Sequence, residues 1–163
     1  MVRKSTKVTY FGFTFDSQGE GQRALALIEW QNDGLISDLE LDKDKLTIVL
    51  QPAFTVPVND KVGYKRQHKM KAITYTPDYR YVYNGVTIHE DFKPRIPKTK
   101  KELARLSPTS RASRFKISIE PDSRIRIRLF HAMLANRENE IFRIVTIPSA
   151  PPNEANHIGY WYK

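Results

Sequence analysis

The dipeptide Asn84-Gly85 stands between two runs rich in Tyr, Val and Ile, residues 72–83 and 86–92. Both residues tolerate the positive φ angles of a type I′ turn, so this arrangement is the strongest short signal for a β-hairpin. The hairpin constrains the fold more than any other feature, because it fixes an antiparallel unit on which the remaining segments must pack. We therefore predict two strands at about 72–83 and 86–92.

Three charged residues lie at the open end of this hairpin: Asp78, Asp91 and Lys93. Residues i and i+2 of a strand share a face, so Asp91 and Lys93 point the same way, as does His89. The opposite face carries Val86, Ile88, Glu90 and Phe92. Because the tight turn folds the strands back on each other, it brings Asp78 towards Asp91 and Lys93. Two carboxylates with a backbone carbonyl can supply half of a Mg²⁺ shell, which water and a phosphate oxygen complete. With a neighbouring lysine, these groups suit phosphodiester hydrolysis.

Composition and charge narrow the function classes. The chain has 163 residues, 40% of them hydrophobic, which fits one domain with a core of its own. It contains no cysteine, so disulfides, thiolate chemistry and cysteine-ligated zinc are excluded. A formal net charge of +9 favours a polyanionic partner, with nucleic acid first and a membrane surface a weaker option. Neither a membrane span nor a signal peptide is recognisable, so we expect a cytoplasmic protein without a membrane partner.

The basic residues are concentrated in two regions, 61–71 and 93–128. We expect DNA contacts from Lys65, Arg66, Lys69, Lys98, Lys100, Lys101, Arg124, Arg126 and Arg128. His89 lies beside the charged cluster and is a weaker candidate for contact with DNA or water.

The remaining segments predict an α/β fold. Residues 8–15 alternate as a short strand or extended arm, 17–33 have the caps and apolar spacing of a helix, and 35–58 read as two strands around a charged turn. We expect a basic loop at 94–116 with a short helix at 99–106. A helix at about 123–137 has the apolar stripe Ile125, Leu129, Ala132 and Met133, and a strand at 140–147 follows. Residues 1–147 then form one domain with a mixed central β-sheet flanked by helices, and 148–163 form a Pro-rich, aromatic tail. Tyr160, Trp161 and Tyr162 of this tail are candidates for base stacking, dimer contacts or packing on the core.

Pro77-Asp78 followed after the hairpin by Asp91-Phe92-Lys93 resembles the signature of the PD-(D/E)xK nuclease superfamily. The phrases GFTFDSQGEGQRA, QPAF, YTPDYRY and HEDFK, in this order, are similar to those of a phage and prophage endonuclease family in that superfamily. The similarity covers residues 11–93 well and 120–147 in outline. It implies a restriction-endonuclease-like core.

The resemblance also implies roles for individual residues. Asp78 and Asp91 would bind Mg²⁺ or Mn²⁺, Lys93 would assist the nucleophilic water, and Glu20 would add a further carboxylate. Independently of the resemblance, Glu20 shares a helical stripe with Ala24, Leu27 and Gln31, which places it at the start of the sheet-facing side.

Each of these residues also has a purely structural explanation. Ser17 and Glu20 fit a capping box, Asp91 with Lys93 fits a solvated ion pair, and Asp78 fits a turn cap after Pro77. Glu90 replaces Asp91 as a ligand if the strand register slips by one residue.

The preferred function is a Mg²⁺-dependent DNA endonuclease of phage recombination or replication, acting on branched DNA such as flaps or four-way junctions. A Holliday junction resolvase needs two sites and therefore a homodimer. The alternatives are a DNA-binding or architectural protein that has lost the chemistry, and a structure-specific RNA binder or RNase.

Overall fold

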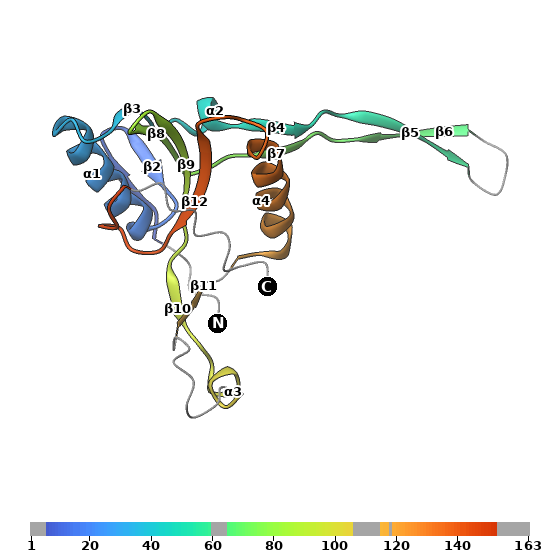
Figure 1. Cartoon of the computed structure of the whole chain (residues 1–163). Coiled ribbons are helices and arrows are strands. Elements are labelled where there is room, and N and C mark those ends of the chain that lie inside the picture. The colour runs from blue at the N-terminus through green and yellow to red at the C-terminus, as the bar shows by residue number, and fades with distance from the viewer. Residues whose placement is uncertain (1–5, 60–64, 106–114, 118, 153–163) are drawn as a thin grey trace.

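A four-stranded mixed β-sheet lies at the centre of the folded body (Figure 1). The computed structural model describes residues 6–59, 65–105, 115–117 and 119–152. The described elements are β1 (Val8–Tyr10), β2 (Phe13–Phe15), α1 (Gln18–Asn32), β3 (Ser37–Glu40), α2 (Lys43–Leu46), β4 (Ile48–Gln51), β5 (Phe54–Asn59), β6 (Lys65–Met70), β7 (Ile73–Tyr75), β8 (Tyr79–Tyr83), β9 (Val86–Phe92), β10 (Arg95–Pro97), α3 (Lys100–Leu103), β11 (Phe115–Ile117), α4 (Pro121–Leu134) and β12 (Glu140–Val145). The sheet order is β12-β9-β8-β3, with β12 parallel to β9 and the other pairs antiparallel.

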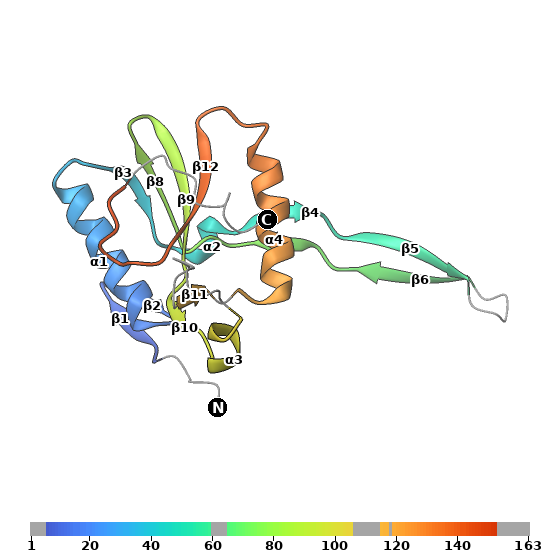
Figure 2. The ribbon, with the colours of Figure 1, turned by 60° about the horizontal axis from the view of Figure 1, so that its bottom comes forward.

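Helices cover both faces of the central sheet, so the body has three layers (Figure 2). On one face α1 buries Ala24 and Leu27 against Tyr79, Tyr81 and Ile88. On the other face α4 buries Ile127, Phe130 and Leu134 against Tyr75, Phe142 and Ile144. The protein is thus an α/β fold with a mixed sheet between helices, as predicted, and its architecture is compatible with the expected restriction-endonuclease-like core.

The predicted hairpin is present, with β8 and β9 paired from Tyr83 opposite Val86 to Tyr79 opposite Glu90. Asn84 and Gly85 have φ angles of 50° and 77°, the left-handed values that a type I′ turn requires. The first predicted strand is interrupted, however. It divides into β7 and β8 around Pro77, because proline has no N–H to contribute to a ladder.

Two other predictions at the N-terminal half were too simple. Residues 8–15 form a hairpin of β1 and β2, because Phe11 and Gly12 adopt positive φ angles and turn the chain. Residues 35–58 contain three strands, and the charged turn is the short helix α2. Asp42 caps this helix by accepting a hydrogen bond from the Asp44 N–H, so the charged run encodes a helix start.

Both long helices were predicted, but the buried face of α4 was wrong. Ile125 and Leu129 of the predicted stripe are 58% and 42% exposed. The buried residues are Ile127, Phe130 and Leu134, which have the i, i+3, i+7 spacing of a helix face. The alternation of Arg and Ile places apolar residues on two faces of the helix. The face that contains Ile127 packs on the sheet, and the face that contains Ile125 is exposed.

Two thin structures project from the three-layered body (Figures 1 and 2). One is the ribbon of β5 and β6, and the other is the pair β10 and β11 together with α3. The latter occupies the described part of the predicted basic loop, which therefore contains two short strands in addition to the helix. The aromatic residues Tyr160, Trp161 and Tyr162 lie outside the described residues.

No helix in the described ranges is both long enough and apolar enough to span a membrane.

Candidate metal-dependent hydrolytic site

The structure brings together Asp78, Asp91 and Lys93, the three residues of the predicted cluster. Asp91 lies near the end of β9, Lys93 follows that strand, and Asp78 precedes β8. Lys93 Nζ lies 3.1 Å from Asp91 Oδ2 and 3.7 Å from Asp78 Oδ2. The hairpin turn thus places both carboxylates around one ammonium group, as the alternation of side chains predicted.

Hydrogen bonds hold the two carboxylates in fixed orientations. Asp78 Oδ2 accepts from the Phe92 N–H at 2.8 Å, and Asp91 Oδ1 accepts from the Asp78 N–H at 3.2 Å. The Tyr75 hydroxyl donates to Asp91 Oδ2 at 2.6 Å. Each aspartate is therefore hydrogen-bonded to the segment that carries the other, and the pair is preorganised. The described contacts leave Asp78 Oδ1 without a hydrogen bond.

The charges of the pair are only partly balanced. Burial and the neighbouring Asp91 carboxylate raise the pKa of Asp78 to about 7, although Lys93 acts in the opposite direction. Burial alone would lower the pKa of Lys93, but the attraction of Asp91 and Asp78 raises it, so the lysine is a cation at neutral pH. An additional cation at this position would therefore stabilise the ionised form of Asp78.

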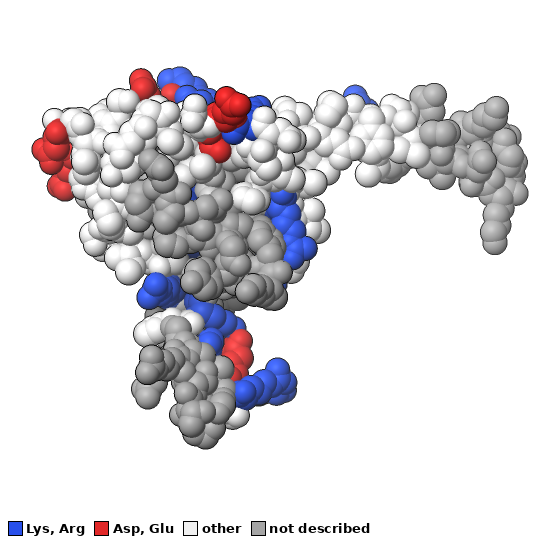
Figure 3. Space-filling model, viewed as in Figure 1, with Lys and Arg blue, Asp and Glu red and all other residues white. Residues whose placement is uncertain are grey.

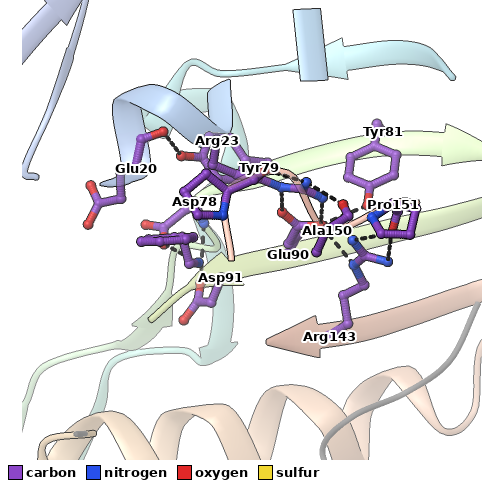
Figure 4. Close-up of polar contacts among 12 residues, drawn as sticks. Glu20, Arg23, Asp78, Tyr79, Tyr81, Glu90, Asp91, Arg143, Ala150 and Pro151 are labelled. Atoms are coloured by element: carbon purple, nitrogen blue, oxygen red, sulfur yellow. Dashed lines mark hydrogen bonds and ion pairs between the residues drawn. The ribbon is translucent and has the colours of Figure 1, made fainter. Parts of the chain in front are cut away.

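Glu20 lies in the first turn of α1 and supplies the third carboxylate. Figure 4 shows the side chains of Glu20, Asp78 and Asp91 gathered at one end of the drawn cluster. The Tyr79 hydroxyl donates to the Glu20 carbonyl at 2.7 Å, which ties this helix end to the start of β8. Glu20 also contributes to the raised pKa of Asp78, as expected for a nearby negative charge.

Capping of α1 involves Glu20 as well. Ser17 Oγ accepts from the Glu20 N–H, as in a capping box, but Glu20 Oε2 accepts from the N–H of Asp16 and not from that of Ser17. One carboxylate oxygen is thus used locally. The capping role and a role beside Asp78 are compatible in this geometry.

A second lysine, which no sequence motif indicated, lies beside the site. Lys43, in α2, lies with its Nζ 3.0 Å from Asp16 Oδ2, at the start of the first helix. Burial alone would lower the pKa of Lys43, but Asp16, Asp78 and Glu20 together raise it. Asp16 belongs to the phrase FDSQGE, which carries part of the family resemblance. Lys43 belongs to a run that was predicted to be a charged turn.

Glu90 occupies the opposite face of β9 and is not an alternative ligand. It is fully buried and accepts hydrogen bonds from both sides: Arg23 Nε at 2.6 Å, Arg143 Nε at 2.8 Å and the Tyr81 hydroxyl at 2.7 Å. Burial opposes its ionisation, but the two guanidinium groups prevail and lower its pKa. Figure 4 shows this carboxylate between the two arginines, away from Asp91.

The same arginines hold the chain that follows β12. Arg23 Nη1 donates to the carbonyls of Pro148 and Ala150, and Arg143 donates to the carbonyl of Pro151. This part of the predicted tail is therefore attached to the core of the domain. No sequence motif indicated this network, because its charged members lie on separate elements.

His89 shares the face of Asp91 but is buried beneath α4. Its Nε2 lies 3.1 Å from Glu140 Oε2, and its ring meets Phe130 edge-on with centroids 5.2 Å apart. With only 3% of the residue exposed, the His89 side chain offers no surface for DNA in this conformation. The contact with water stays a prediction.

A family model matches residues 3–107, which is well over half of the chain. The chain belongs to the DUF1064 family. The family is described as proteins of unknown function, and the matched range contains Glu20, Asp78, Asp91 and Lys93 but ends before α4 and β12. No curated protein and no solved structure matches the chain.

The predicted DNA-binding residues of this DUF1064 chain lie on three surfaces. Lys65, Arg66 and Lys69 belong to β6, and the described side chain among them, Lys69, is exposed. Lys98, Lys100 and Lys101 are on the projection that contains α3, and Arg124, Arg126 and Arg128 are exposed on α4. Figure 3 shows Lys and Arg both on that projection and on the neighbouring side of the body.

The donor set suits Mg²⁺ or Mn²⁺, which prefer carboxylate oxygens. Within the described ranges, no group of three or more His, Asp or Glu side chains forms a ready-made metal cage. Mg²⁺ does not require one, because it keeps several waters and often binds through one or two carboxylates and a substrate phosphate. Asp78 and Asp91 of this DUF1064 site fit that pattern, with Glu20 as the additional acidic group.

Proposed function

We propose that the protein is a metal-dependent DNA endonuclease that hydrolyses phosphodiester bonds. The observation that carries this proposal is the convergence of Asp78 and Asp91 on Lys93, held by hydrogen bonds between their own strands. Glu20 borders the same cluster. The basic surfaces of β6, α4 and the α3 projection supply the cations that a polyanionic substrate requires.

In the proposed mechanism, Asp78 and Asp91 would hold the divalent cation, and Glu20 would add negative charge at the border of its site. When bound, that cation polarises the phosphate and lowers the pKa of a water molecule. The hydrogen bonds from Tyr75 and from the two backbone amides keep both aspartates in place, so little reorganisation accompanies substrate binding.

Lys93 acts as a cation and not as a base in this proposal, since both aspartates stabilise its protonated form. Its ammonium group can orient the attacking water and stabilise negative charge that develops on the phosphate. Lys43, which is 42% exposed, is available to contact a substrate phosphate from the α2 side of the site.

The main alternative is a DNA-binding protein with the same fold and no activity. The site disfavours it, because adjacent buried carboxylates repel each other and would also repel DNA phosphates. A protein that only binds DNA gains nothing from keeping them. The same site chemistry also permits an RNA substrate, so RNA belongs in the test.

The test compares wild type, Asp91→Ala and Asp91→Asn on labelled linear, flap, forked and four-way-junction DNA and on a matched RNA duplex. Binding and cleavage are scored on the same samples with Mg²⁺, Mn²⁺ or EDTA. Asp122→Ala is the matched control, because it removes an exposed aspartate in the first turn of α4 and changes the net charge equally.

We expect metal-dependent cutting by wild type and by Asp122→Ala. Both Asp91 variants should lose roughly 10²-fold or more of the cleavage rate, because a metal contributes several kcal/mol to the transition state. Their DNA affinity should be retained. Tight binding without cutting by wild type in either metal would refute the nuclease, and cutting of RNA alone would make it an RNase. Sedimentation with a four-way junction determines whether two copies act together, as junction resolution requires.

A further inference from the structure

The β5–β6 ribbon, hereafter the arm, projects far beyond the three-layered body (Figures 1 and 2). Its six cross-strand pairs run from Phe54 opposite Met70 to Asn59 opposite Lys65. At its base, β4 and β7 continue the antiparallel pairing as far as Gln51 opposite Ile73. In the described part of the chain, the two arm strands pack extensively only against each other. An isolated two-stranded ribbon is only marginally stable, so the arm adds little to the stability of the fold. Its protrusion is therefore better explained by a function.

The positive charges of the arm lie on one of its two strands. β5 contains no charged residue, whereas β6 and the two residues after it contain Lys65, Arg66, Lys69 and Lys71 and no acidic residue. Lys69 and Lys71 are exposed. A strand with three cations, followed at once by a fourth and without a carboxylate of its own, is complementary to a polyanion.

Exposed apolar side chains accompany these cations. Phe54, Val56 and Met70 are 42%, 37% and 41% exposed, and Phe54 lies directly opposite Met70 in the ladder. Because Val56 is two residues from Phe54, all three share one face of the arm. Lys69 lies opposite Thr55 and is therefore on the other face of the arm. A ribbon with apolar groups on one face and a cation on the other suits a DNA groove, where thymine methyl groups and sugars lie within and phosphates line the rim.

The base of the arm is connected to the candidate site. β7 ends at Tyr75, whose hydroxyl donates to Asp91 Oδ2, and only Thr76 and Pro77 separate this residue from Asp78. Tyr75 is also part of the core beneath α4. A ligand held by the arm is therefore held at a defined position relative to the two aspartates.

We propose that the arm binds double-stranded DNA in the major groove, beside the segment that is cut, and thereby selects substrates with a duplex flank. The major groove admits a two-stranded β-ribbon, and six residues of strand span about 20 Å, close to six base-pair steps. This inference rests on the proposed nuclease function, whose substrate class it specifies.

The first experiment removes the arm. Replacing residues 52–72 by Asn-Gly joins Gln51 to Ile73, which already lie opposite each other, through a two-residue hairpin turn. Affinity for a 20-base-pair duplex and for a four-way junction is measured by anisotropy at several salt concentrations, and cleavage at saturating DNA is measured in parallel. We expect the Kd to rise at least tenfold and the slope of log K against log salt to fall by about 2 to 4. Cleavage at saturation should change less than threefold.

The second experiment leaves the backbone intact. Lys69→Gln with Lys71→Gln removes two exposed cations from the arm, and Lys45→Gln with Arg137→Gln removes two from elsewhere, at sites 66% and 47% exposed. The arm pair should raise the Kd several-fold and reduce the salt slope by about 2. The control pair should change the Kd less than twofold.

The outcomes separate the two proposals. An unchanged duplex Kd and salt slope in the arm variants, with wild type still cutting, would refute the role of the arm alone. Failure of wild type to cut any DNA would refute the nuclease, whatever the arm binds. Loss of a dimer on truncation with unchanged DNA affinity would show that the arm binds a second copy, which also refutes the inference.

Discussion

Asp78→Asn should stabilise the protein at alkaline pH while it abolishes cleavage. The asparagine is almost the same size, and its amide oxygen can still accept the hydrogen bond from the Phe92 N–H. It has no negative charge, so the repulsion by Asp91 and the cost of burying a charge disappear. A residue retained at the expense of stability is typical of a functional site.

The size of the stabilisation by Asp78→Asn follows from the pKa values of Asp78 in the folded and unfolded states. In the folded protein the carboxyl keeps its proton up to about pH 7, whereas in the unfolded chain it loses it near the ordinary value of 3.8. Between these values the folded state binds more protons at Asp78, so the contribution of this residue to the stability of wild type falls as pH rises from about 4 to 7 and is then constant. At 1.36 kcal/mol per pKa unit, the cost at pH 8 is at most about 4 kcal/mol. At pH 5 the cost is about 1 to 2 kcal/mol.

The assay is urea unfolding of wild type and Asp78→Asn at pH 5 and pH 8, with Asp44→Asn as an exposed aspartate control. Titrating groups distant from Asp78 are common to the proteins and cancel in the comparison. We expect the advantage of Asp78→Asn to grow by about 2 to 3 kcal/mol between the two pH values. Mg²⁺ at pH 8 should stabilise wild type and not Asp78→Asn, because a ligand stabilises only the state that binds it. If Asp78→Asn is equally more stable than wild type at both pH values, or no more stable at either, the assigned burial of Asp78 and its repulsion by Asp91 are refuted.

Three further changes probe the surroundings of the site. Glu90→Gln should lower the free energy of unfolding by about 3 to 5 kcal/mol, because it leaves two buried guanidinium groups without their carboxylate. In the same urea experiment, the control Glu29→Gln replaces an exposed residue and should change the free energy of unfolding by less than about 0.5 kcal/mol. Tyr75→Phe removes the hydrogen bond to Asp91 and should reduce Mg²⁺ affinity, measured by calorimetry, by roughly tenfold; unchanged affinity would exclude a positioning role. Lys43→Gln should raise the KM for DNA several-fold with kcat nearly unchanged, and an effect on kcat alone would contradict a phosphate contact.

The predictable part of the site is the part encoded within one hairpin. Asn84-Gly85 fixed the turn, and the two-residue period of strands then placed Asp91 and Lys93 on one face and Glu90 on the other. The distances from Lys93 to both aspartates confirm this geometry. These relations could be predicted because they depend on local backbone geometry alone.

Other parts could not be predicted, because they depend on contacts between distant segments. The Tyr75 hydroxyl reaches Asp91 only because Pro77 ends one strand before the next begins. Lys43 reaches Asp16 only because the charged turn folds as a helix beside α1. Likewise, the Arg-Ile alternation of α4 offered two apolar faces, and only the sheet determined that Ile127 is buried and Ile125 exposed.

By itself, the sequence determined that Glu90 and Asp91 face opposite ways, that the hairpin turns at Asn84-Gly85 and that the chain has an excess of positive charge. Only the tertiary structure decided which carboxylate is neutralised. Packing of α1 and β12 brings Arg23 and Arg143 to Glu90, whereas the face of Asp91 receives Lys93 and a second carboxylate. The physical reason is that strand alternation is a local property, but the charge that a buried side chain meets is set by whichever elements fold against its face.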